Sequence, residues 1–277
     1  MSGKYIRARS LSGKDNAGPL HLQVASPKRD KSRGKNSVAG GTLSGAWMSK
    51  MKIAIYDLDK TITRRPTFTH FLLFYASRRS PLRLAALPVW LIALIGYRVG
   101  FYGRKPLKQF GIFMFMGRHL HPGALHQMAS DFVTTAVMKD IQPGASQSIE
   151  DDRKEGCKLV IATAAPSFYA AEIGARLRFD AVVATQNSVR SDGRISHKID
   201  GENCYGSEKL KMVSAWFNRQ ALKRKDCHIS VYSDHASDAP LMDWADIAYL
   251  VNASEKLRQL AAQKNWQLRN FSVDDGH

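Results

Sequence analysis

The sequence predicts an α/β fold: a doubly wound parallel sheet, Rossmann-like in its core, with an inserted helical cap. Three short apolar runs read as buried strands, at residues 53–56, 159–162 and 229–232. Residues 181–184 and 246–251 add two more, so we expect at least five strands. Helical segments separate these runs, and strands that alternate with helices form parallel sheets covered on both faces.

The spacing of the strands predicts the domains. About a hundred residues separate the first two strands, far more than one crossover needs, and the excess predicts an inserted cap. We expect a catalytic core at residues 51–61 and 146–277 and a helical, basic, partly apolar cap at residues 62–145. Residues 1–50 are rich in Ser, Gly, Lys and Arg and predict a disordered basic tail. Such a tail is either genuine or the product of a start codon assigned too far upstream.

Six polar residues follow or flank the predicted strands. The set comprises Asp57, Asp59, Thr163, Lys209, Asp234 and Asp238. Side chains just past the carboxyl ends of parallel strands line one crevice, so we expect these residues to converge on one site. Carboxylates, a lysine and a hydroxyl are the groups needed to move a phosphoryl group with a divalent cation.

Each residue of this set can be given a chemical role. Asp57, at a strand end, is placed to attack phosphorus, and Asp59 to protonate the leaving oxygen and later deprotonate water. Thr163 and the backbone N–H groups of a helix predicted at residues 167–177 can hold the phosphoryl oxygens. Lys209 supplies positive charge. Clustered carboxylates stay ionised only beside a cation, and oxygen ligands favour Mg²⁺.

The order of these residues resembles a known superfamily. The motifs are Asp57-x-Asp59-x-Thr61, Thr163, Lys209 and the run from Ser233 to Asp238. They match in order the four motifs of the haloacid dehalogenase superfamily, most closely its phosphoserine-phosphatase-like branch. The resemblance implies a phosphoaspartyl mechanism with Mg²⁺ bound by Asp57, the backbone carbonyl of Asp59, and Asp234. It also implies that Asp238 lies behind these ligands and orients Lys209. Asp at position 59 resembles the phosphohydrolases rather than the dehalogenases.

The predicted cap is strongly basic and contains an apolar run. Residues 60–130 include eleven Lys and Arg but no Asp or Glu. Within them, residues 84–97 are uncharged. As one helix this run would be only ~21 Å long, and a span needs about 20 apolar residues. Pro88 should also kink it. We therefore expect the run not to cross a bilayer.

We expect the cap to lie on an anionic membrane surface instead. In this hypothesis Trp90 and its aliphatic neighbours enter the lipid, and Arg78, Arg79 and Arg83 contact lipid phosphates. The alternative is that the apolar run packs as ordinary cap core. The missing acidic residues favour the membrane, because a soluble cap around a small polar substrate seldom needs that bias.

A second, narrower resemblance concerns the substrate. The stretches at residues 78–82, 162–166 and 206–209 resemble the bacterial C-type phosphatidylglycerophosphate phosphatases, over about residues 51–250. This likeness implies a lipid phosphate monoester presented from the membrane by the cap. Two alternatives stay open. One is a soluble small-metabolite phosphatase of the phosphoserine type, and the other is a membrane-tethered binding protein without activity.

Charge and cysteine content narrow the partners and the compartment. The net charge of +17 belongs to the tail and the cap, while the catalytic core is nearly neutral. Such a field also suits nucleic acid, but no nucleic-acid motif or stacking pattern is present, so we disfavour that partner. Cys157, Cys204 and Cys227 have neither metal spacing nor an even framework, which indicates a reducing cytoplasm. We therefore expect a peripheral or monotopic location on the cytoplasmic face of the plasma membrane.

Overall fold

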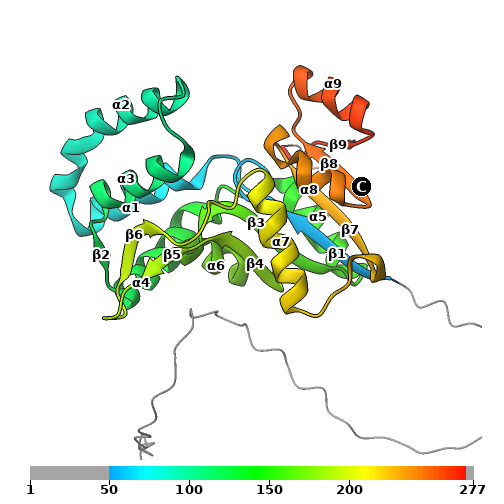
Figure 1. Cartoon of the computed structure of the whole chain (residues 1–277), viewed down its shortest axis with the longest axis horizontal. Helices are drawn as coiled ribbons and strands as arrows, with labels where there is room; N and C mark the ends of the chain where they lie inside the picture. The colour runs from blue at the N-terminus through cyan, green and yellow to red at the C-terminus, as the bar shows by residue number, and fades with distance from the viewer. Residues whose placement is uncertain (1–49, 273–277) are drawn as a thin grey trace, which may run out of the picture.

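A parallel six-stranded sheet forms the centre of the computed structural model, which describes residues 50–272 (Figure 1). The strand order is β4-β3-β1-β7-β8-β9, and every neighbouring pair is parallel. The strands are β1 Met51–Tyr56, β3 Lys158–Pro166, β4 Ala181–Thr185, β7 Cys227–Ser233, β8 Ile247–Val251 and β9 Gln267–Arg269. This arrangement confirms the predicted α/β fold. The predicted tail, apart from Lys50, lies outside the described residues.

Helices cover both faces of the sheet, because alternate residues of each buried strand point to opposite sides. Ile53 and Ile55 of β1 pack in one core with α7 and α8, whereas Ala54 and Tyr56 pack in the other with α5 and α6. Figure 1 shows these two helix pairs on opposite sides of the strands. The helices are α5 Pro143–Lys154, α6 Ser167–Arg176, α7 Ser207–Arg219, α8 Ala239–Trp244 and α9 Glu255–Lys264.

The segment between β1 and α5 forms a helical lobe beside the sheet (Figure 1). It contains α1 Thr67–Arg79, the 3-10 helix η1 Pro81–Ala86, α2 Leu87–Arg98, α3 Arg104–Phe115, α4 Pro122–Phe132 and the π-helix η2 Val133–Val137. A small antiparallel sheet joins this lobe to a later hairpin. Its strands are β2 His119–Leu120, β5 Asn187–Val189 and β6 Ile195–Ile199, in the order β2-β6-β5. The hairpin β5–β6 therefore pairs with a cap strand.

The apolar run at residues 84–97 differs from its prediction in two ways. Pro88 does not kink a helix, because it occupies the first turn of α2, where proline has no N–H to lose. Trp90 is not available to lipid, so that prediction is wrong. Its side chain is 1% exposed and packs edge-on against Phe115, with ring centroids 6.0 Å apart. Gly111 makes room for the indole, since a Cβ there would lie 2.9 Å from it.

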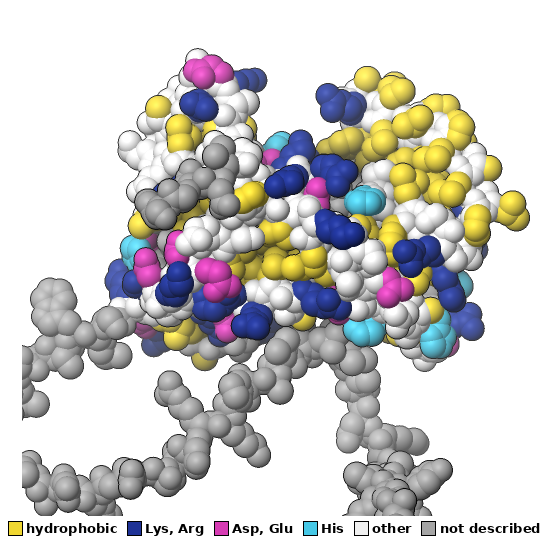
Figure 2. Space-filling model, turned by 180° about the vertical axis from the view of Figure 1, so that it is seen from behind, with side chains coloured by type: hydrophobic (Ala, Val, Ile, Leu, Met, Phe, Trp, Pro, Cys, Tyr) yellow, Lys and Arg dark blue, Asp and Glu magenta, His cyan; other side chains and the backbone are white. Residues whose placement is uncertain are grey.

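The opposite face of α2 is apolar and exposed. Ile92 and Ile95 are 68% and 62% exposed. Large hydrophobic side chains nearby in the chain that are also exposed are Leu82, Val89, Leu91, Val99 and Phe101. Together these seven residues form what we call the α2 patch. Figure 2 shows apolar side chains gathered over this lobe. Within residues 50–272, Pro81–Arg98 is the one helical stretch that is long and apolar enough to span a membrane, judged by length and composition alone.

Candidate active site

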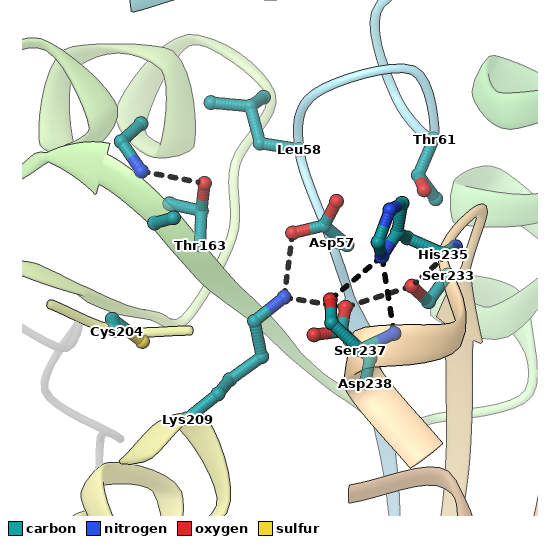
Figure 3. Close-up of polar contacts among 12 residues, drawn as sticks. Asp57, Leu58, Thr61, Thr163, Cys204, Lys209, Ser233, His235, Ser237 and Asp238 are labelled. Carbon is teal, nitrogen blue, oxygen red and sulfur yellow. Dashed lines mark hydrogen bonds and ion pairs between the residues drawn. The ribbon is translucent and has the colours of Figure 1, made fainter. Parts of the chain in front are cut away.

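Asp57, Lys209 and Asp238 meet at the carboxyl end of the sheet, as predicted (Figure 3). Asp57 follows β1, and its N–H donates to the carbonyl of Tyr232 at 2.9 Å. Gly206, with φ of 62°, is the residue just before α7, and Lys209 lies in the first turn of that helix. The Lys209 ammonium donates to Asp57 Oδ1 at 2.8 Å and to Asp238 Oδ2 at 2.6 Å. The lysine therefore holds two carboxylates from different loops together.

Asp238 is a buried support for this arrangement. Its Oδ2 also accepts a hydrogen bond from the Ser233 hydroxyl at 2.7 Å. The same Ser233 oxygen accepts from the N–H of His235 at 3.2 Å, which shapes the loop after β7. The orientation of Lys209 by Asp238, expected from the superfamily resemblance, is thus visible in the hydrogen bonds.

Burial and charge shift the pKa values of these groups strongly. Burial raises the pKa of Asp57 to about 7, although Lys209 opposes the shift, and Asp238 and Asp234 add to it. Burial also raises the pKa of Asp234. Burial disfavours the charged form of Lys209 and by itself would lower its pKa, but the charges of Asp238 and Asp57 raise the pKa overall. The ionised forms of Asp57 and Asp234 therefore need more positive charge than Lys209 alone supplies.

The donor atoms of this site fit a hard divalent cation. Oδ1 of Asp57 binds Lys209, while Oδ1 of Asp234 has only a long 3.5 Å contact with the Thr61 hydroxyl. With the backbone carbonyl of Asp59, which the superfamily resemblance adds, the two carboxylates would offer an oxygen-only set suited to Mg²⁺. Residues 50–272 contain no group of three or more His, Cys, Asp or Glu side chains that could hold a metal. The inferred set uses only two side chains, so it does not require such a group.

Asp59 connects the site to the cap. Its Oδ1 accepts hydrogen bonds from the backbone N–H of Thr67 at 2.8 Å and from the Thr67 hydroxyl at 2.7 Å. Thr67 is the first residue of α1, so the carboxylate caps the amino end of this helix. The Thr67 hydroxyl also lies 3.1 Å from the hydroxyl of Tyr169 on α6. The position of the expected acid–base group therefore depends on the first cap helix.

Thr163 lies buried near the end of β3. Its hydroxyl oxygen accepts from the N–H of Ala165 at 3.0 Å, which fixes the turn leading to α6. The helix predicted at residues 167–177 is present as Ser167–Arg176. Binding of phosphoryl oxygens by this loop stays a prediction.

Sequence reasoning missed one buried residue, Lys108 of α3. Its ammonium donates to Asn203 Oδ1 at 2.7 Å and to the carbonyl of Ala164, the residue after Thr163. Lys108 is one of the eleven basic residues at positions 60–130, and the sequence pattern gives it no individual role. The sequence offered one signal of a shared binding face, because Arg104 and Lys108 are four residues apart and lie on the same side of a helix. The Arg104 guanidinium stacks 3.7 Å from the ring centroid of Tyr205, just after Asn203.

The predicted membrane arginines lie away from this cluster, and the structure distinguishes them. Arg78 stacks over the ring of Phe74 at 4.4 Å from the centroid, and Arg79 is exposed at the end of α1. Arg83 instead donates to the carbonyls of Phe113 and Met114, at 3.0 and 2.9 Å, in the last turn of α3. Arg83 therefore links the 3-10 helix η1 to the end of α3 within the cap.

Comparison with known proteins places this geometry in a family. The model of the haloacid dehalogenase-like hydrolases matches residues 54–243. Phosphoserine phosphatase SerB1 of Mycobacterium tuberculosis is 31% identical over 119 residues, which cover 43% of this chain. The chain spans only 37% of that relative's length. Protein CicA of Caulobacter vibrioides is 25% identical over 213 residues, covering 76% of this chain and 91% of CicA.

Solved structures share the fold. A crystal structure from Bordetella pertussis, of a protein with unknown function, aligns with a TM-score of 0.71 and 22% identity, covering 79% of this chain and 98% of that one. A substrate-bound phosphoserine phosphatase aligns with a TM-score of 0.54 and 14% identity, covering 82% and 95%. The family model covers more than half of the chain and includes all the residues that meet in Figure 3. The chain therefore belongs to the haloacid dehalogenase-like hydrolases.

Proposed function

We propose that this hydrolase is a Mg²⁺-dependent phosphomonoester phosphatase that works through an aspartyl-phosphate on Asp57. The observation that supports this most strongly is the junction of Asp57, Lys209 and Asp238, with Asp59 two residues beyond Asp57. It supplies a nucleophile, a fixed positive charge and an acid–base group at one end of the sheet.

The reaction has two steps at these residues. A carboxylate oxygen of Asp57 forms a bond to phosphorus while the bond to the ester oxygen breaks, and Asp59 gives its proton to that oxygen. Water then attacks phosphorus, Asp59 takes the proton from the water, and Asp57 is released with inorganic phosphate. Lys209 stabilises the negative charge throughout. When bound, Mg²⁺ would neutralise charge on the phosphoryl oxygens.

Phosphate release from p-nitrophenyl phosphate, with and without Mg²⁺, tests this proposal. Asp57→Asn removes the attacking oxygen anion but keeps the shape, so its turnover should fall below detection with little change in melting temperature. Asp226→Asn, at an exposed carboxylate just before β7 and so at the opposite end of that strand from the site, is the matched control and should keep full activity. Turnover by Asp57→Asn near the rate of the unaltered protein would refute the mechanism.

A small soluble phosphomonoester is the substrate class that the comparisons support best. The sequence relative SerB1 is named a phosphoserine phosphatase, and phosphoserine phosphatases share the fold. The cap adds one restriction. Phosphoserine carries an ammonium group, yet residues 60–130 contain no carboxylate to pair with it. The two later cap carboxylates have other partners, Asp140 with Arg65 and Asp131 with Gln127. We therefore propose a small phosphomonoester without a cationic group.

A membrane lipid phosphate, such as phosphatidylglycerophosphate, is the second candidate, and the α2 patch favours it. Scattered exposed hydrophobic residues are normal, but contiguous ones indicate an interaction surface. Arg78, Arg79 and Arg98 flank the patch, and the absence of acidic residues nearby suits an anionic lipid surface. On this proposal the protein lies on the cytoplasmic face of the plasma membrane, with α2 parallel to it. The packing of Trp90 on the protein side supports a surface position over a span.

A comparison of phosphate release from four substrates decides between the candidates. They are phosphatidylglycerophosphate, phosphatidate, phosphoserine and a small carboxylated ester such as 3-phosphoglycerate. The soluble candidate requires a higher kcat/KM for a soluble ester, and a protein that stays in the supernatant without detergent. The lipid candidate requires a higher kcat/KM for a lipid ester, and a protein that sediments with membranes unless detergent is added.

A further inference from the structure

Two lysines are buried near the catalytic loops, and they differ in their partners. Lys209 is paired with two carboxylates. Lys108 is equally inaccessible, with 8% of its surface exposed, but its two hydrogen-bond acceptors are the neutral oxygens of Ala164 and Asn203. No carboxylate of residues 50–272 lies within ion-pair distance of it.

Such an ammonium is unstable without an anion. Transfer of an unpaired cation into a protein interior costs several kcal/mol, and a lysine has three N–H donors. Two of them have acceptors here. Burial accordingly lowers the pKa of Lys108 to about 7, while Asp59 acts in the opposite direction. An incoming anion would pair the charge and use the remaining donor.

The position of Lys108 identifies which part of a substrate could supply that anion. Lys108 comes from the cap helix α3, and Asp59 is its strongest charged neighbour. The Lys108 ammonium lies 5.7 Å from the ring centroid of Phe68, and the preceding residue, Thr67, donates to Asp59. In the proposed reaction Asp59 protonates the ester oxygen, so Lys108 belongs to the side of the leaving group. The transferring phosphoryl group has its own cation in Lys209, which donates to Asp57 at 2.8 Å.

The surroundings of Lys108 are rigid. The Thr185 hydroxyl donates to the same Ala164 carbonyl at 2.8 Å and lies 3.0 Å from Asn203 Oδ1, and it accepts from the N–H of Cys204 at 3.1 Å. Both acceptors of Lys108 are therefore fixed by the end of β4. A lysine held in this way is positioned for binding.

We propose that Lys108 is a specificity residue that binds an anionic group on the leaving part of the substrate. The inference rests on the proposed phosphatase function and refines it. The anion is a carboxylate if the substrate is a small metabolite, and a phosphodiester if the substrate is a lipid such as phosphatidylglycerophosphate. Among alkyl esters, which need protonation of the leaving oxygen, those with a neutral leaving group should be poorer substrates than their anionic counterparts.

The test compares matched pairs of ligands. For the soluble source, 3-phosphoglycerate is compared with glycerol 3-phosphate, which lacks the carboxylate. For the lipid source, phosphatidylglycerophosphate in detergent micelles is compared with phosphatidate, which lacks the phosphodiester. The unaltered protein should prefer the anionic member of at least one pair, and that pair identifies the source. Lys108→Met should reduce the preference in kcat/KM at least tenfold.

Two further variants separate binding from structure. Lys105→Met, three residues earlier and partly exposed, is the matched control and should keep the preference. Asn203→Asp should abolish the preference by giving Lys108 an internal partner, and it covers the case in which Lys108→Met does not fold. No preference in the unaltered protein, or an equal loss on both members of each pair, would overturn the proposal.

A binding measurement keeps this test independent of turnover. Calorimetric affinities for the same ligand pairs are measured in the Asp57→Asn protein, with and without Lys108→Met. The Asp57→Asn protein should bind the anionic member of a pair more tightly, and Lys108→Met should remove that difference in affinity. If it is present while the unaltered protein hydrolyses no ester, the proposed function fails and the anion site stands. If affinities for inorganic phosphate fall as much as those for 3-phosphoglycerate, the lysine contacts the transferring group and the proposal is wrong.

Discussion

Replacing Ile92 and Ile95 together by Glu should release the protein from anionic membranes without unfolding it. Fully burying an Ile side chain contributes about 1.5–3 kcal/mol. Since the two residues are 68% and 62% exposed, lipid would remove most of their surface from water. Their joint contribution is then roughly 2–4 kcal/mol. Because 1.4 kcal/mol is tenfold, their loss should weaken partitioning roughly thirtyfold to several-hundredfold.

Sedimentation with vesicles that contain phosphatidylglycerol measures this effect, and melting temperature measures the fold. Substitutions at exposed positions usually change stability by less than about 0.5 kcal/mol, so the double variant should melt close to the unaltered protein. Leu268→Glu is the matched control. Leu268 is an exposed apolar residue, 48% accessible, on the edge strand β9 away from the cap. It should leave vesicle binding unchanged.

Two outcomes would refute the reasoning. If the double variant sediments with vesicles as well as the unaltered protein does, the α2 patch does not contact lipid. If it melts far earlier, the outer face of α2 is packed against protein and its exposure in the isolated chain is misleading. Trp90 fluorescence is a poor reporter in either case, because the indole is already buried and should barely shift when vesicles are added.

Further predictions concern acid–base catalysis, the arginines and pH. Asp59→Asn should lower kcat by roughly 10²–10⁴-fold for poor leaving groups and less for p-nitrophenyl phosphate, which needs little protonation; an equal loss on both would count against the role. Arg83→Gln should lower the melting temperature, because it frees two carbonyls of α3, whereas Arg78→Gln with Arg79→Gln should weaken vesicle binding by about 1 kcal/mol each at low salt and leave melting unchanged. Lys108→Met should stabilise the protein most below pH 7. The pKa of this lysine is about 7 in the folded chain, against an ordinary value of 10.5. The cost of burying its charge is therefore fully present below pH 7 and disappears as pH rises toward 10.5. If the lysine were not buried as an ammonium, the difference in melting temperature between Lys108→Met and the unaltered protein would stay constant across that range.

The candidate site residues could be predicted because their placement follows from topology alone. Asp57 and Asp234 each come directly after a run that is buried on both faces, and the ends of parallel strands meet at one edge. No knowledge of side-chain packing was needed. Lys209 follows from the order of the motifs, and its two ion pairs show that its side chain reaches the site from the first turn of α7.

The cap was harder to predict because its features depend on packing between distant segments. Residues 84–97 are apolar on every side, so periodicity cannot tell which face is buried. The orientation of Trp90 is decided by Gly111, which lies on another helix. Likewise, the burial of Lys108 depends on Asn203 and on the end of β4, neither of which is near it in sequence.

The cations of the cap do not form a single positive surface, which weakens the case that the charge of the cap binds it to a membrane. Lys108 is buried, so it contributes little to an outer field, and Arg83, although exposed, is held against the end of α3. Figure 2 shows further Lys and Arg side chains gathered in the hollow between the two lobes, away from the apolar patch. A count of eleven basic residues therefore overstates the attraction of the cap to a membrane. Part of that charge is better explained by an anionic substrate, which is why the Lys108 and Ile92 experiments must be interpreted together. A lipid substrate requires both to succeed, whereas a soluble anionic ester requires only the first.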